Sequence, residues 1–275
     1  MQTPNSAAGV PRSQLVYPRE RVLYAAVVAV SLLVYGGIGL VAVSEPGVGA
    51  SAVFYVALFA LAGTLAHGLA LGRIRGSAVR VSERQFPLLH RLVQEHARRL
   101  GLKRAPEIYL LESGGLLNAF AARCFGRDFI VVHSDVLALA LERGEDAVSF
   151  VVAHELGHHW RGHLKRRWLT APGRFVPYLG AAYSRACEYT CDRIGAYCQP
   201  EGAISGLMAL AAGPQLYQHV DVREFAAQAE RDKDFWVRRA ELMASHPRLP
   251  KRVAALLQLG VALPKTAELP TVAAA

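Results

Sequence analysis

Two long uncharged apolar segments near the N-terminus constrain this chain more than any other feature. They cover residues 22–43 and 51–72, and a short stretch with Pro and Gly, residues 44–50, separates them. A helix rises about 1.5 Å per residue, so each segment is long enough to cross a bilayer core of about 30 Å. The first is also too long for a typical signal-peptide core. We therefore predict a transmembrane helical hairpin over residues 22–72.

Basic residues on both flanks of the hairpin predict its orientation. The connecting stretch has only Glu45, whereas arginines stand just outside the two apolar segments, at Arg12, Arg19, Arg21, Arg73, Arg75, Arg80 and Arg84. Short cytoplasmic segments carry an excess of Lys and Arg, so both ends of the hairpin are expected in the cytoplasm. We predict a multi-pass protein of the inner or plasma membrane of a bacterial cell, with its globular domain on the cytoplasmic side.

The rest of the chain is predicted to form one globular domain between two tails. Residues 1–21 contain three prolines and no apolar periodicity, so we expect a mostly disordered cytoplasmic tail. The domain is expected over residues 77–262, and residues 263–275 are expected to form a flexible tail. The net charge of +9 fits a surface beside anionic lipid. No nucleic-acid recognition motif accompanies it, so no nucleic-acid partner is expected.

The pattern of apolar residues in this domain predicts an α+β fold that is mostly helical. Strands are expected at 107–111, 118–122 and 128–133, and helices at 86–100, 134–143, 145–161, 184–198, 201–212 and 222–244. The four cysteines, Cys124, Cys187, Cys191 and Cys198, include no C-x-x-C pair. They are expected to be small buried residues in a reducing compartment rather than a structural zinc site.

The helix expected at 145–161 carries the pattern H-E-x-x-H. His154 and His158 are four positions apart and so lie on one face of a helix, from which both imidazoles reach one zinc ion. Glu155 then stands beside the water that such an ion would bind, and can take a proton from it. A helix with two surface histidines matches the same pattern, but the apolar stretch 148–153 before His154 favours the metal site.

Two histidines require a third protein ligand, and Glu188 is the best candidate. It lies on the helix expected at 184–198, and Asp192 follows one turn later, where a carboxylate can hold the free ring nitrogen of a ligand histidine. Taken alone, this pair would fit a solvated helix face. The incomplete ligand set upstream makes the metal interpretation the better one.

Four short motifs in the same order resemble a known family. HELGHHWRGH (154–163), CEYTCD (187–192), SHPRLPKR (245–252) and LNAFA (117–121) look like the corresponding segments of the HtpX and CAAX prenyl protease family of integral-membrane zinc endopeptidases. The resemblance covers residues 85–259. It implies a gluzincin fold, in which a small mixed sheet lies over a mostly helical body.

The resemblance also implies a set of functional residues. One zinc ion per chain would be held by His154, His158 and Glu188, and Glu155 would be the general base. His246 would stabilise the oxyanion, Arg252 would anchor its loop, and Asp192 would support the ligands. The edge strand with Asn118, Ala119 and Phe120 would pair with an extended polypeptide substrate.

The chain departs from the family pattern in a few places. Cys191 stands where Ala is usual, and Leu117 stands where Pro is common. Members of the HtpX type carry further spans between the zinc helix and the third ligand, but residues 169–183 here contain Pro172, Gly173, Arg174 and Pro177 and are too short to span. This favours a cytoplasmic cleft over an intramembrane chamber.

These features predict an endopeptidase that acts on membrane-associated or misfolded polypeptides. Three alternatives remain open: a non-catalytic membrane scaffold of the same fold, an enzyme that processes lipidated C-terminal peptides, and a catalytic domain outside the membrane. The scaffold would be expected to lack part of the ligand set, and processing of lipidated peptides requires a large enclosed cavity. The sequence predicts neither the substrate nor the oligomeric state.

Overall fold

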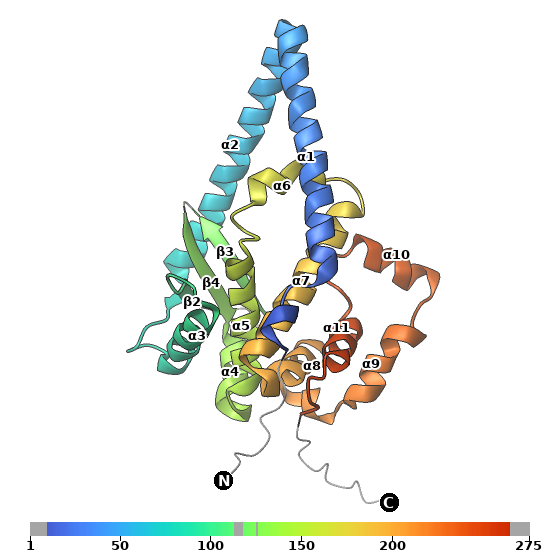
Figure 1. Ribbon diagram of the computed structural model, residues 1–275. Helices are drawn as coiled ribbons and strands as arrows, with labels where there is room; N and C mark the ends of the chain where they lie inside the picture. The colour runs from blue at the N-terminus through green and yellow to red at the C-terminus, as the bar shows by residue number, and fades with distance from the viewer. Residues whose placement is uncertain (1–9, 113–117, 125, 265–275) are drawn as a thin grey trace, which may run out of the picture.

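A computed structural model describes residues 10–112, 118–124 and 126–264. Two long helices, α1 (Pro18–Ser44) and α2 (Pro46–Ser77), project from a body of shorter helices and one sheet (Figure 1). Both are long and apolar enough to cross a membrane, judged by length and composition. The sheet and most of the helices gather at the ends of α1 and α2 that are away from the hairpin tip.

The connection between the two long helices is shorter than expected. We expected a turn over residues 44–50, but α2 already begins at Pro46, and only Glu45 lies between the helices. Proline is favoured in the first turn of a helix because its missing N–H needs no partner there. The backbone N–H of Gly49 donates to the carbonyl of Glu45, which starts the helical ladder.

The prediction of a disordered tail over residues 1–21 is wrong for residues 10–21. Val10 and Leu15 are buried in the main core, on either side of a short 3-10 helix, η1 (Arg12–Gln14). The backbone N–H of Tyr17 donates to Oγ1 of Thr190, 3.0 Å away. Isolated apolar residues without periodicity carry no signal of order in the sequence, and only contacts with distant elements fix this segment. Residues 1–9 lie outside the described residues, as does most of the predicted C-terminal tail.

A four-stranded mixed sheet forms one side of the body. Its order is β1 (Val79–Arg80), β2 (Glu107–Leu111), β4 (Arg127–His133) and β3 (Ala119–Cys124). The strand β2 pairs in parallel with β4, and the other two pairs are antiparallel. The expected small mixed sheet is confirmed, and β3 is an edge strand among the described residues.

The helical body is built around α5 (Asp146–Arg161), which carries the H-E-x-x-H pattern. Helices α7 (Leu179–Cys198) and α8 (Pro200–Leu216) pack against it, and the fully buried Leu156 and Ile194 lie between α5 and α7 in the core. Around them lie α3 (Pro87–Leu100), α4 (Ser134–Arg143), α6 (Arg167–Arg174) and α11 (Leu249–Gln258). The apolar face of α5 therefore fixes the orientation of its opposite, polar face.

The region after α8 contains a break that we did not predict. A single helix was expected over 222–244, but the structure divides this stretch into α9 (Val222–Arg231) and α10 (Phe235–Met243), which follow the short 3-10 helix η2 (Tyr217–His219). Asp234 ends the continuity, because its carboxylate accepts hydrogen bonds from the N–H groups of Trp236 and Val237 and so caps a new helix.

Candidate metal centre

Three side chains from two helices converge at the centre of the body. His154 and His158 lie one turn apart on α5, with ring centroids separated by 5.4 Å. Glu188 reaches them from α7. Its Oε2 lies 3.4 Å from Nε2 of His154, and its Oε1 lies 3.4 Å from Nε2 of His158.

These separations fit a tetrahedral ion. Two ligand atoms about 2.0–2.1 Å from a tetrahedral zinc ion are about 3.3 Å apart, close to both measured distances. Glu188 is buried, and burial alone would raise its pKa. The hydrogen bonds to His154 and His158 outweigh burial and hold the pKa of Glu188 well below its usual range. The donor set of two imidazoles and an ionised carboxylate therefore fits zinc.

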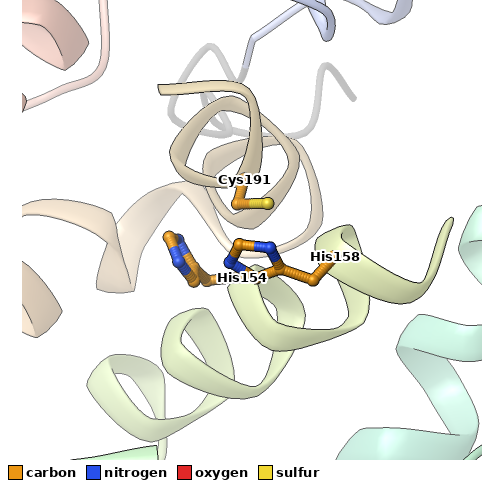
Figure 2. A group of neighbouring side chains, drawn as sticks. All are labelled: His154, His158 and Cys191. Atoms are coloured by element: carbon orange, nitrogen blue, oxygen red, sulfur yellow. The ribbon is translucent and has the colours of Figure 1, made fainter. Parts of the chain in front are cut away.

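Cys191 also lies beside the two histidines, as Figure 2 shows. Its side chain projects from α7 above the imidazole rings, but it is completely buried, and burial raises the pKa of its thiol well above the usual range. A metal ligand must be a thiolate, which such surroundings disfavour. Glu188, unlike Cys191, lines the open cavity, so it suits the third position better.

The second ring nitrogen of His154 is held by a buried ion pair. Its Nδ1 lies 3.0 Å from Oδ1 of Asp192, and a carboxylate only accepts, so the imidazole donates. Arg252 donates to both oxygens of Asp192, at 2.8 and 2.6 Å. Burial lowers the pKa of His154, but Asp192 and Glu188 outweigh burial and raise it to about 10.

The second ring nitrogen of His158 is held by residues that the sequence did not single out. Its Nδ1 lies 3.1 Å from Nδ1 of His163, and Nε2 of His163 lies 3.3 Å from Oε1 of Glu20 on α1. Arg161 donates to the same oxygen of Glu20, at 3.0 and 2.6 Å. Gly162 makes this possible. It ends α5 in the left-handed conformation and turns His163 back, so that its N–H donates to the carbonyl of His158.

The direction of these hydrogen bonds follows from Glu20. Its carboxylate accepts from Nε2 of His163, and burial lowers the pKa of His163, so this ring is neutral and its Nδ1 must accept from His158. Nε2 of His158 is then the ring nitrogen that faces Glu188, 3.4 Å away, and it is the atom available to bind an ion between the two side chains.

Glu20, His163 and Cys187 form a second close group of possible ligands. Arg161 already supplies the positive charge at this carboxylate, through two hydrogen bonds to one oxygen. The burial of Cys187, with the nearby charge of Glu20, raises the pKa of its thiol to about 12. This group therefore suits a supporting role better than a metal site.

A cavity of about 220 Å³ opens beside the three candidate ligands. Glu155, His246 and the edge-strand residues Ala119 and Phe120 line it. Nε2 of His246 lies 3.5 Å from Oε1 of Glu188, and its side chain is mostly exposed. Asn118, just before β3, lines an adjoining small cavity with Glu155 and His154, and its carbonyl accepts from the N–H of His133.

The loop that carries His246 is anchored differently from what the family resemblance implied. Arg252 is buried and pairs with Asp192 rather than with the loop backbone. The anchor is Arg185 on α7, whose Nη1 lies within 3.1 Å of the carbonyls of Glu241, Leu242 and Ala244. Arginine is suited to this role because its guanidinium carries several N–H donors in a fixed plane.

The whole segment from α3 to α11 matches the sequence profile of Peptidase family M48, over residues 83–174 and 169–259. The chain belongs to Peptidase family M48. Members of this family are zinc-dependent metallopeptidases. No curated protein sequence matches the chain closely enough to add to this assignment.

A solved structure shares the fold of this chain. The crystal structure of S. mikatae Ste24p aligns with a TM-score of 0.50 and 15% sequence identity, over 88% of this chain and 67% of that chain. At this identity the likeness supports the fold alone. The aligned share of this chain is larger than the part matched by the family.

Several residues of this M48 site were absent from the sequence-based set, namely Glu20, Arg161, His163 and Arg185. His163 had a weak signal, since it closes the HELGHHWRGH segment. Glu20 had a signal as well, as an acidic residue directly before an uncharged apolar segment. The sequence could not predict that Glu20 and His163 contact each other, because the two residues are 143 positions apart.

Proposed function

We propose that this M48 peptidase is a membrane-anchored zinc endopeptidase whose ion is held by His154, His158 and Glu188. Two separations carry this proposal: Oε2 of Glu188 lies 3.4 Å from Nε2 of His154, and its Oε1 lies 3.4 Å from Nε2 of His158, both close to the edge of a tetrahedral site. A bound zinc ion supplies Lewis-acid polarisation of the scissile carbonyl. The three ligands form a single site, so we expect one zinc ion per chain.

The chain's own residues supply the remaining steps. Glu155 takes a proton from the attacking water and passes it to the leaving amine. The edge strand β3, from Asn118 through Ala119 to Phe120, pairs with an extended polypeptide and lays the scissile bond across the cavity. His246, which also lines the cavity, stabilises the charge that develops on the carbonyl oxygen.

The same proposal places the protein in a bilayer. In this proposal the hairpin of α1 and α2 crosses an inner or plasma membrane, and the excess of arginine at its base supports a cytoplasmic location for the metallopeptidase domain, residues 77–262. Membrane-associated or misfolded polypeptides are then the substrates within reach.

The decisive experiment compares Glu155→Gln with the purified wild-type chain in detergent or proteoliposomes. We expect casein cleavage to fall about a thousandfold, because the base is lost, while zinc content by mass spectrometry stays near one per chain. Glu230→Gln, which changes an exposed carboxylate of α9, is the matched control and should leave the rate unchanged. Cleavage by Glu155→Gln at the wild-type rate would disprove the mechanism.

The same assay separates the peptidase from a non-catalytic scaffold of this fold. A peptidase should lose cleavage when a chelator removes the ion and regain it when zinc is restored. A scaffold would bind polypeptide without cleaving it under any metal condition.

A further inference from the structure

The short helix α6 lies beside the first apolar segment of the chain, at the base of the fork between α1 and α2 (Figure 1). The hydroxyl of Tyr35 donates to the carbonyl of Trp168, 2.6 Å away, and the N–H of Gly173 donates to Oγ of Ser31, 2.9 Å away. Gly173 packs so closely on α1 that a Cβ there would lie 2.2 Å from the carbonyl oxygen of Val27. The helix therefore contacts α1 between residues 27 and 35.

The length of the hairpin places this contact within the bilayer. A core of about 30 Å corresponds to about 20 helical residues, counted from the tip at Glu45 down each helix. This count reaches about residue 25 on α1 and about residue 65 on α2. On α2 the boundary agrees with the packing, since Nε2 of His67 is the first polar contact to the sheet, 3.1 Å from the carbonyl of Arg123. On α1, however, the residues that contact α6 lie on the lipid side of the estimated membrane boundary.

The side chains of α6 and of the residues that follow it suit this depth. Phe175 is 87% exposed and Trp168 is 51% exposed, and Leu169, Val176 and Tyr178 are each more than a third exposed. Arg174 is the only charged residue between 168 and 178. The hydroxyl of Thr170 donates back to the carbonyl of Arg166, and Ser31 is fully buried under α6, so these polar groups are shielded from lipid.

Basic side chains mark the shallow end of the same segment. Lys165, Arg166 and Arg167 precede the apolar stretch. The Arg166 guanidinium lies over the ring of Tyr24, 5.0 Å from its centroid, close to the boundary estimated from the hairpin length. Trp and Tyr favour the interface between headgroups and hydrocarbon, and long basic side chains reach from there toward anionic headgroups.

We propose that residues 167–178 form a lipid-seated segment, embedded in the near leaflet of an anionic bilayer beside the hairpin. This proposal rests on the membrane location given under the proposed function. It deepens that function, because Leu164, just before this segment, and Arg174, within it, also line the cavity with Glu155 and His158. The cavity then opens at the membrane surface, and its substrates are polypeptide segments that emerge from the bilayer.

The native tryptophans allow a direct test in the full-length chain. Trp160→Phe with Trp236→Phe leaves Trp168 as the reporter of the segment. Trp160→Phe with Trp168→Phe leaves Trp236, an exposed residue of α10, as the matched control. Both proteins are reconstituted in phosphatidylcholine–phosphatidylglycerol vesicles whose acyl chains carry bromine, a quencher of tryptophan fluorescence.

We expect brominated lipid to quench Trp168 at least about threefold more than Trp236, and aqueous acrylamide to quench it correspondingly less. Equal quenching of the two tryptophans by brominated lipid would overturn the proposal, as would full access of acrylamide to Trp168. If Trp160→Phe prevents folding, single Trp168→Phe and Trp236→Phe proteins answer the same question, since only the first should lose the lipid-quenched fraction.

A third reporter separates failure of this proposal from failure of the membrane location. Phe59→Trp, in a chain with the three native tryptophans changed to Phe, reports insertion of the hairpin. Strong lipid quenching at position 59 without quenching of Trp168 would reject the lipid-seated segment and keep the membrane anchor. Absence of lipid quenching at both positions would reject both.

Discussion

His154 and His158 face Glu188 at the same distance, 3.4 Å, but different parts of the molecule hold their second ring nitrogens. His154 donates to Asp192, which is paired with Arg252, so its support comes from α7 and α11. His158 contacts His163, which bonds to Glu20 on α1. One half of the candidate metal centre is therefore built by the peptidase domain alone, and the other half depends on how the hairpin sits on that domain.

The two supports also differ in charge. Asp192 and Arg252 form a buried ion pair with two short hydrogen bonds, which makes the support of His154 strong and costly to break. The support of His158 passes through a neutral imidazole before it reaches a charge. Substitutions in the support of His154 should therefore lower zinc affinity more than substitutions in the support of His158.

Asp192→Asn should have the largest effect. It removes the charge that orients His154 and leaves Arg252 buried without an ionised partner, so we expect zinc affinity to fall about 100-fold and unfolding stability to fall by about 3 kcal/mol. Competition with a fluorescent zinc chelator measures the first quantity, and denaturant unfolding measures the second. Wild-type values for both would show that the ion pair does not support the metal centre.

Metal binding should depend on pH through His154. Its pKa is raised to about 10, so below that pH the ring holds a proton that an incoming ion must displace. Zinc affinity should therefore decrease about tenfold for each unit by which the pH falls between 8.5 and 6.5. Asp192→Asn should flatten this slope, because it removes a carboxylate that raises the pKa. An equal slope in both proteins would contradict the assignment.

Glu20→Gln tests the second support. We expect zinc affinity to fall about fivefold, because His163 loses the ionised acceptor that directs its other nitrogen toward His158. Ser31→Ala is the matched control, since it removes a buried hydrogen bond to Gly173 from the same helix but leaves His163 untouched. The control should lower stability by about 1 kcal/mol at wild-type zinc affinity. Equal zinc affinities for Glu20→Gln and Ser31→Ala would show that the metal centre does not depend on Glu20 of α1.

Thr190→Val should have the smallest effect. It removes the acceptor of the Tyr17 N–H, where the chain before α1 meets α7, and we expect a loss of about 1 kcal/mol in unfolding stability. Thr190 also hydrogen-bonds to Glu20, but Arg161 and His163 still hold that carboxylate, so zinc affinity should change by less than about twofold. A larger loss of zinc affinity in Thr190→Val than in Glu20→Gln would contradict the proposal that Glu20 contributes more to the metal centre than Thr190.

Much of the fold was predictable because its signals are local. The length of two apolar segments predicted the hairpin helices, and a short apolar run predicted the strand β2 at its observed bounds. The helix break at Asp234 was missed because an aspartate can either cap a new helix or continue an existing one, and a single residue does not indicate which occurs. The burial of Val10 and Leu15 was missed because their partners lie on elements distant in the sequence.

The sequence by itself determined the spacing of His154, Glu155 and His158, since residues four apart on a helix share a face whatever surrounds them. The tertiary structure alone decided that Glu20 supports His158, that Arg185 anchors the loop of His246, and that α6 lies against α1 at the level of Ser31. The physical reason is the range of the interactions. Helical periodicity acts over a few residues and is written in the order of the chain, whereas contacts between residues far apart in the sequence exist only once the chain has packed.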